Sequence, residues 1–162
     1  MGTIAGDSTN YKIYLSTTKT GAAGEETPTG DIVYFWAESY DKSPANLQQP
    51  KPSVAKSHYY PASKYNIEIT LKNIHVAAQG AITATTEADA IDNFLYQKSI
   101  RRGSSGFYLF LYHEADAQYR KLDWNSTGTQ IRPLFCAISG WNDHAEKGKL
   151  IVYPSMKFIK AG

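Results

Sequence analysis

The chain has 162 residues, of which 42% are hydrophobic and 20% charged, and its formal net charge is +2. Such a composition is typical of a globular domain with a buried core, and it excludes a chain that stays disordered for lack of apolar residues. The small net charge argues against a nucleic-acid-binding surface, and the single cysteine, Cys136, excludes an intrachain disulfide.

Two strands are predicted in the first quarter of the chain. Apolar and polar side chains alternate over residues 11–15, as in a strand with one buried face. Over residues 32–40 both faces are apolar, which is typical of a strand covered on both sides. Residues 17–30 are rich in Thr, Gly, Ala and Glu, and we expect them to form a loop between the two strands.

A long proline-rich loop is predicted over residues 41–63, which hold four prolines with Gln, Lys and Ser between them. Proline lowers the entropy cost of an extended segment, and tyrosine is enriched at protein interfaces. We therefore interpret this loop as an arm that contacts a neighbouring subunit; the Lys, Gln and Ser content is also suitable for a disordered tether. The candidate interface residues are Pro50, Pro52, Tyr59 and Tyr60.

The clearest amphipathic strand covers residues 65–76. One face carries Tyr65 and a series of apolar residues at every second position, which predicts a buried face. Ile74 and Val76 continue on the opposite phase, so a bulge or bend is predicted near Asn73. The wet face is formed by Asn66, Glu68, Thr70 and Lys72.

One helix is predicted over residues 86–100, with Thr86 as its cap. Ile91, Phe94 and Leu95 follow helical spacing and form an apolar stripe, which we expect to pack against the sheet. Four more strands follow, over residues 107–112, 119–124, 131–139 and 149–160. The order predicts a mainly β fold in a single domain over residues 1–162: a β-sandwich or barrel of about seven strands with one flanking α-helix.

No motif in the sequence indicates catalysis, a metal site or a cofactor. Cys136 lies in an apolar strand, where a buried structural thiol is expected rather than a nucleophile. Residues 101–106 could bind an anion, but a helix C-cap followed by a turn is the favoured interpretation. The four histidines lack the spacing of zinc ligands: His58, His75, His113 and His144.

The aromatic residues leave a binding function open as an alternative. Aromatic residues make up 13% of the chain, and exposed Tyr and Trp rings can stack on sugars. Trp36 and Trp124 are expected in the core, whereas Trp141 lies in a predicted turn and is expected to be partly exposed. The alternative function is a carbohydrate- or receptor-binding β-sandwich module.

The order of these elements resembles the tail-tube proteins of phages and the tube subunits of contractile injection systems. In that family a small β-sandwich with a flanking helix and a long loop forms six-membered rings, whose sheets join into an inner barrel and which stack into a tube. The resemblance implies that residues 41–63 are the arm and that the wet face of residues 65–76, with Asn66, Glu68, Thr70 and Lys72, faces the lumen. These four residues are mixed in charge, which departs from the acidic lumens typical of the family.

The resemblance also implies a location and partners. The expected role is that of a structural protein, not an enzyme, in a viral tail that is assembled in the host cytoplasm. Its partners would be further copies of the chain in hexameric stacked rings and other tail or baseplate proteins, with DNA passing through the channel without specific binding. The chain has no apparent signal sequence and no apolar run of membrane-spanning length, so we expect no membrane association.

Overall fold

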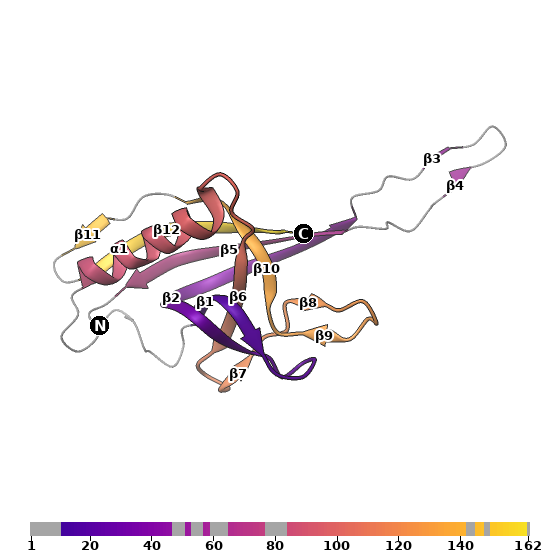
Figure 1. The fold of residues 1–162 in the computed structure, drawn as a ribbon, viewed down its shortest axis with the longest axis horizontal. Coiled ribbons are helices and arrows are strands. Elements are labelled where there is room, and N and C mark those ends of the chain that lie inside the picture. The colour runs from indigo at the N-terminus through magenta and orange to yellow at the C-terminus, as the bar shows by residue number, and fades with distance from the viewer. Residues whose placement is uncertain are drawn as a thin grey trace.

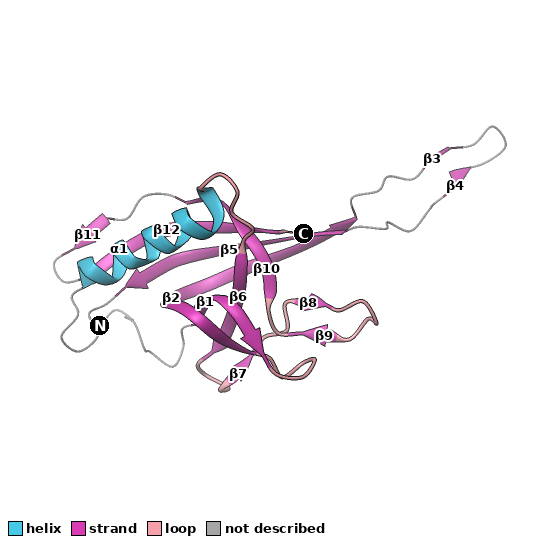
Figure 2. Cartoon of the chain, in the orientation of Figure 1, coloured by secondary structure: helices cyan, strands magenta, loops and turns pink. Residues whose placement is uncertain are grey.

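The computed structural model describes residues 11–46, 51–52, 57–58, 65–76, 84–141, 145–147 and 150–161. Strands dominate these residues, and the single helix among them lies between β5 and β6 (Figures 1 and 2). The elements are β1 (Tyr11–Thr20), β2 (Thr27–Asn46), β3 (Lys51–Pro52), β4 (Ser57–His58), β5 (Tyr65–Val76), α1 (Ala84–Leu95) with its continuation η1 (Tyr96–Ile100), β6 (Phe107–His113), β7 (Gln118–Tyr119), β8 (Asp123–Trp124), β9 (Gln130–Ile131), β10 (Leu134–Trp141), β11 (Ala145–Lys147) and β12 (Leu150–Lys160).

Six of the strands close a barrel. Their order is β1-β2-β5-β12-β10-β6, and β6 pairs back with β1, from Tyr11 opposite His113 to Ser16 opposite Tyr108. All of these neighbours are antiparallel, β7 extends the sheet beyond β6, and β11 pairs with β12. The predicted mainly β barrel with one flanking helix is therefore confirmed.

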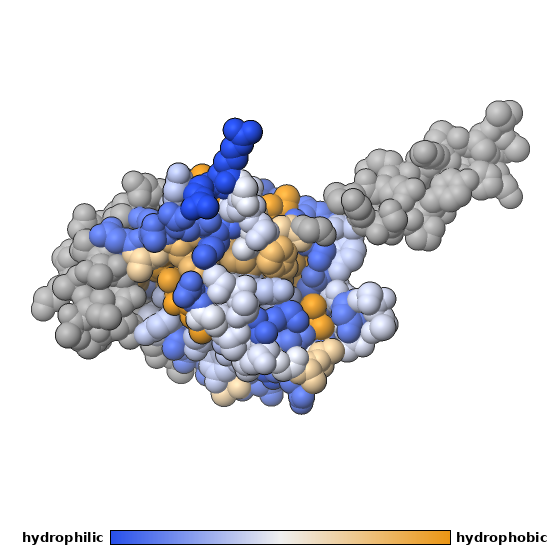
Figure 3. All heavy atoms as spheres, viewed as in Figure 1, coloured by the Kyte–Doolittle hydropathy of each residue, from blue (hydrophilic) through white to orange (hydrophobic). Residues whose placement is uncertain are grey.

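The core is built from the inward-facing positions of the barrel strands. Side chains at alternate positions of each strand point to the same side, so Ile67, Ile69 and Leu71 of β5 are all fully buried. The same cluster includes Ile13 of β1 and Phe158 of β12. On the surface, hydrophilic residues dominate the face seen in Figure 3, with apolar residues visible in small groups between them.

The helix covers the barrel with the predicted stripe. Ile91, Phe94 and Leu95 are 1%, 6% and 0% exposed, and the Phe94 ring meets the Phe107 ring edge-on with centroids 5.5 Å apart. The helix begins two residues before the predicted start, so Thr86 lies inside it and is not the cap. No helix in the described part of the chain is long and apolar enough to cross a membrane.

The last turn of the helix is wider than an α-turn. Residues 96–100 form a π-helix, in which the backbone N–H of Arg101 donates to the carbonyl of Tyr96 at 2.8 Å. This turn is tied to the barrel, because the backbone N–H of Ile138 in β10 donates to Ser99 Oγ at 2.7 Å. The helix is therefore held to the barrel at its C-terminal end as well as along its apolar stripe.

The predicted loop over residues 17–30 is mostly strand. β1 runs to Thr20 and β2 begins at Thr27, with Thr18 paired with Thr29 and their hydroxyl oxygens 2.8 Å apart. Threonine is β-branched and suits a strand, and its polarity led to the loop prediction. Only residues 21–26 remain as a turn.

The prediction of one long loop over residues 41–63 is also wrong in part. β2 continues to Asn46, and its second half pairs with β5 from Trp36 opposite His75 to Asn46 opposite Tyr65. Within the same segment, β3 and β4 form a separate two-stranded sheet in which Lys51 pairs with His58. In Figure 1 this small sheet lies away from the barrel, beyond the ends of β2 and β5. The polar residues of this segment obscured the strand because they do not alternate with apolar ones.

The strands are irregular at some of the positions where the sequence predicts it. Asn73 has a left-handed φ of 54°, and the pairing of β5 is interrupted there with both neighbours while the register stays the same on either side. The predicted irregularity is therefore present as a local distortion of the strand, and no extra residue is inserted as in a bulge. The predicted strand over residues 119–124 divides into β7 and β8, and the one over residues 131–139 divides into β9 and β10. Pro133 lies in the second gap, where it has no N–H to donate to a neighbouring strand.

Candidate functional site

The candidate lumen residues lie together on the outer face of β5. Asn66, Glu68 and Thr70 are half-buried and Lys72 is exposed, while the residues between them point into the core. This arrangement agrees with the strand pattern read from the sequence.

Charges on this outer face are balanced by pairs between neighbouring strands. Lys72 Nζ lies 2.7 Å from Asp41 Oδ2 of β2, and Lys157 Nζ of β12 lies 2.8 Å from Glu68 Oε1. The four side chains are between 33% and 65% exposed, so each pair contributes little to stability. Their effect is electrostatic: the two cations and two carboxylates cancel, and this part of the sheet carries no net charge.

The candidate interface residues are only partly described. Pro52 lies in β3, where it is paired with Ser57 of β4. Pro50, Tyr59 and Tyr60 lie outside the described residues. The interface prediction at these positions therefore stays a prediction.

A buried polar network stabilises the end of the barrel at which β2 ends and β5 begins. Asp123 of β8 is 4% exposed, and its Oδ1 accepts hydrogen bonds from the Tyr65 hydroxyl at 2.6 Å and from the backbone N–H of Trp124 at 2.8 Å. Its Oδ2 accepts from Lys160 Nζ at 2.6 Å. The carboxylate thus joins β5, β8 and β12. Sequence reasoning missed this network, because a lone Asp in a short polar segment gives no signal of burial.

The network predicts how stability depends on alkaline pH. Burial, reinforced by the hydrogen bond to Asp123, raises the pKa of Tyr65 from 10.0 to about 12. The folded protein therefore holds this proton more tightly than the unfolded chain does, and the Tyr65 contribution to stability is complete below pH 10.0 and lost as the pH rises through about 12. Denaturant unfolding should show stability falling over this interval, and Tyr65→Phe should reduce the fall.

A matched control for this pH dependence is Tyr96→Phe, because the Tyr96 side chain is 49% exposed and outside the network. The control variant should lose stability with rising pH as steeply as the unmodified chain. An equally steep loss in Tyr65→Phe would show that the phenol of Tyr65 is not the titrating group.

The residues considered for chemistry lie apart in the structure. Cys136 is fully buried, and burial raises the pKa of its thiol well above the ordinary value, as expected of a structural cysteine. His75 is half-buried, its Nδ1 has no hydrogen-bond partner in the described part of the chain, and burial lowers its pKa. His113 lies in contact with Asp116 at 3.1 Å. Among the described residues, no three His, Cys, Asp or Glu side chains come together as metal ligands.

The tryptophans proposed for carbohydrate stacking differ in burial. Trp36 is 7% exposed, and its Nε1 donates to Glu114 Oε1 at 3.2 Å. Lys12 Nζ lies 5.4 Å from the Trp36 ring centroid, so the face of this ring is already in contact with a cation. Trp124 and Trp141 are half-buried against the core. The predicted burial of Trp36 and the predicted partial exposure of Trp141 are confirmed, but Trp141 is the last residue of β10 and does not lie in a turn. Trp124 is more exposed than predicted.

The segment over residues 101–106 forms the C-terminal turn of the helix. The backbone N–H of Gly106 donates to the carbonyl of Lys98 at 2.9 Å, and that of Ser104 to the carbonyl of Arg101 at 3.0 Å. These bonds satisfy carbonyls at the helix end. The favoured interpretation from sequence, a helix end and turn, is therefore confirmed.

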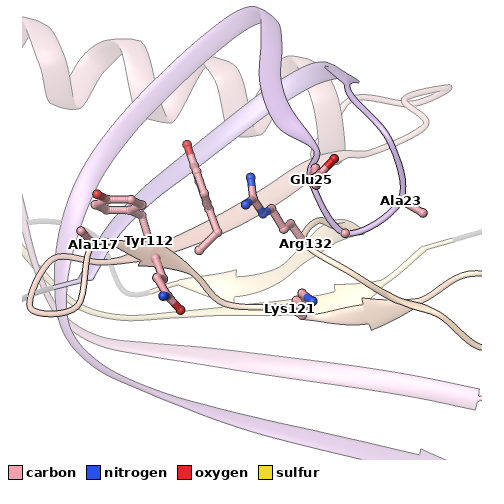
Figure 4. Close-up of a pocket in the computed structure, with 9 residues that line it drawn as sticks. Ala23, Glu25, Tyr112, Ala117, Lys121 and Arg132 are labelled. Carbon is pink, nitrogen blue, oxygen red and sulfur yellow. The ribbon is translucent and has the colours of Figure 1, made fainter.

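A pocket of about 700 Å³ opens beside the β1–β2 turn (Figure 4). Three chain segments form it: the β1–β2 turn, the end of β6 with the β6–β7 turn and β7, and the residues next to β8 and β9. Sequence reasoning did not identify it, because these segments are distant in the chain. Its lining residues are Ala23, Gly24, Glu25, Tyr112, Ala117, Gln118, Tyr119, Lys121 and Arg132.

No protein-family model matches the chain, and the comparisons with curated proteins and with solved structures gave no match.

Proposed function

We propose that the chain is a structural subunit of a viral tail tube or a similar tube, in which copies form stacked, hexameric rings around a central channel. The observation that carries this proposal is the separate β3–β4 sheet beyond the paired ends of β2 and β5. A two-stranded sheet on its own is only marginally stable in water. The surface of a neighbouring copy supplies the contacts that such a sheet lacks in the monomer.

A closed ring suits subunits of a single kind that each carry one projecting segment. Here that segment is the ribbon, the part of the chain over residues 47–64 that contains β3 and β4. When the ribbon of each copy contacts a different surface on the next copy, rotation closes a ring and satisfies every contact. Stacked rings follow if the ribbon reaches a copy in the adjacent ring.

The outer face of β5 supports the assignment of a channel wall. Its charges are cancelled by the Lys72–Asp41 and Lys157–Glu68 pairs, so it presents no net positive field to a polyanion. DNA binds proteins chiefly by neutralising phosphates with unpaired Lys and Arg. A channel lined by Asn66, Glu68, Thr70 and Lys72 with these paired neighbours would let DNA pass without holding it.

In this role the chain performs no catalytic step and uses no cofactor. Its partners are further copies of itself and, at the ends of the tube, other tail or baseplate proteins. It is assembled in the host cytoplasm and becomes part of the virion tail, without contact to a membrane.

The ribbon is tested by removing it at the point where the strands are still paired. Asn46 and Tyr65 lie directly opposite each other, so residues 47–64 can be replaced by Asn-Gly, which favours a two-residue hairpin turn. The unmodified chain is expected to form rings or tubes by light scattering and negative-stain electron microscopy. The shortened chain should stay monomeric with an unchanged β-sheet circular dichroism spectrum.

A matched control removes a different hairpin. Replacing residues 125–129, between the paired strands β8 and β9, with Asn-Gly shortens another hairpin and should leave assembly intact. The proposal is wrong if the chain without residues 47–64 assembles normally, or if the unmodified chain remains a monomer at high concentration.

A further inference from the structure

The pocket beside the β1–β2 turn brings two cations together. In the view of Figure 4 the guanidinium of Arg132, a residue between β9 and β10, lies between Tyr112 and Glu25, with Lys121 on a neighbouring segment. The guanidinium of Arg132 lies 4.9 Å from the centroid of the Tyr119 ring. Stacking on an aromatic ring holds a guanidinium plane in place while leaving N–H groups at its edge free to donate.

Neither cation has a carboxylate partner among the residues that the structure describes. Within the described part of the chain, no ion pair joins Arg132 or Lys121 to an acidic side chain, and Arg132 Nη1 donates only to the backbone carbonyl of Glu26 at 3.2 Å. The buried carboxylate of Glu26 is engaged elsewhere, since its Oε1 accepts from the backbone N–H groups of Gly24 at 2.9 Å and Arg132 at 3.3 Å. Two cationic side chains therefore line this pocket, and neither has a carboxylate partner among the described residues.

We propose that this pocket binds a small anionic ligand, whose carboxylate or phosphate group is held by Arg132 and Lys121. The guanidinium offers a planar pair of donors, and the ammonium a second positive charge. Gln118, Tyr112 and Tyr119 line the same pocket, and amide and hydroxyl groups of this kind are suited to hydroxyl groups of a ligand. The volume of about 700 Å³ is in the range of small-molecule sites.

Glu25 is the one acidic residue that lines the pocket, and its substitution gives a specific test of anion binding there. Its exposed carboxylate forms no ion pair with either cation among the described residues, and it would repel a bound anion. Replacing it with Gln should therefore tighten binding, by about two- to fivefold for an exposed charge. A gain in affinity cannot result from damage to the fold.

The test is a calorimetric and NMR titration of the full chain with inorganic phosphate, with glucuronate and with glucose. Phosphate or glucuronate should bind saturably and shift the amide signals of Gly24, Gln118 and Tyr119, whereas glucose should not. Preference for phosphate indicates a phosphorylated ligand, and preference for glucuronate indicates a carboxylated one. Arg132→Gln and Lys121→Gln should each weaken binding, the former by about tenfold or more.

Arg102→Gln is the matched control, because Arg102 is exposed at the end of the helix and lines no part of the pocket. Its affinity should equal that of the unmodified chain. Arg132→Gln also removes a bond to the β1–β2 turn, so Lys121→Gln and Glu25→Gln carry the test if that variant is less stable. The proposal is overturned if neither anion saturates, if glucose binds equally well, or if the Lys121 and Glu25 variants bind as the unmodified chain does. The titration does not depend on assembly, so either proposal can fail alone.

Discussion

Replacing Asp123 with Ala is expected to lower the free energy of unfolding by about 3–5 kcal/mol, the usual cost of removing one partner of a buried ion pair. The Asp123 side chain is 5% exposed, and it accepts from Lys160, Tyr65 and the backbone of Trp124. Its loss leaves the Lys160 ammonium group without this acceptor and leaves the Tyr65 hydroxyl only the longer bond to the carbonyl of Trp124 at 3.3 Å. The Lys160 side chain is 21% exposed and can reach water in part, which favours the lower end of the range.

Denaturant unfolding of Asp123→Ala and Asp116→Ala compares the loss of stability at the buried carboxylate with the loss at a surface carboxylate. Asp116 also contacts two partners, His113 and Arg120, but its side chain is 44% exposed, so its replacement should cost less than about 1 kcal/mol. Similar losses in both variants would show that the buried network does not stabilise the barrel end. Asp123→Asn, which keeps the shape without the charge, separates the ionic from the hydrogen-bonding contribution.

Replacing Phe94 with Ala is expected to lower the free energy of unfolding by about 3–5 kcal/mol, as for a large side chain removed from a core. Phe94 is 6% exposed and packs edge-on against Phe107, which in turn meets Phe158 of β12 with ring centroids 5.9 Å apart. The cavity would therefore open between the helix and the barrel, where the strand backbone cannot collapse to fill it.

Tyr96→Ala is the control for the helix, since Tyr96 lies in the next turn and is 49% exposed. It removes an aromatic ring of similar size from the surface and should change stability by less than about 1 kcal/mol. Chemical denaturation of both variants compares the two sites. A loss below about 1 kcal/mol for Phe94→Ala would mean that the helix is peripheral to the core.

The sequence predicted those elements whose burial repeats along the chain. β5 was predicted with its observed bounds because every second residue is apolar, and the change of phase near Asn73 coincides with its left-handed backbone. The helix stripe was found for the same reason, from the spacing of Ile91, Phe94 and Leu95. In each case the sequence period and the direction of the side chains are linked by the geometry of the backbone.

Features that depend on partners distant in sequence could not be predicted. The C-terminal end of β1 and the N-terminal end of β2 are polar. They form strands because each supplies hydrogen bonds to the other, as at Thr18 and Thr29. Asp123 is buried because β5 and β12 bring Tyr65 and Lys160 to it. The pocket is likewise formed by three separate segments, and no local sequence pattern indicates that such distant segments come together.

Closure of the barrel has a consequence for the order in which the chain folds. β1 and β2 can pair as soon as both have been synthesised, but β1 meets its second neighbour only when β6 is complete, since Tyr11 pairs with His113. Contacts between such distant residues slow folding, because a long loop must close before they form. Until then the free edge of β1 is open to other nascent chains, so a chain interrupted before β6 would be prone to aggregate on the ribosome.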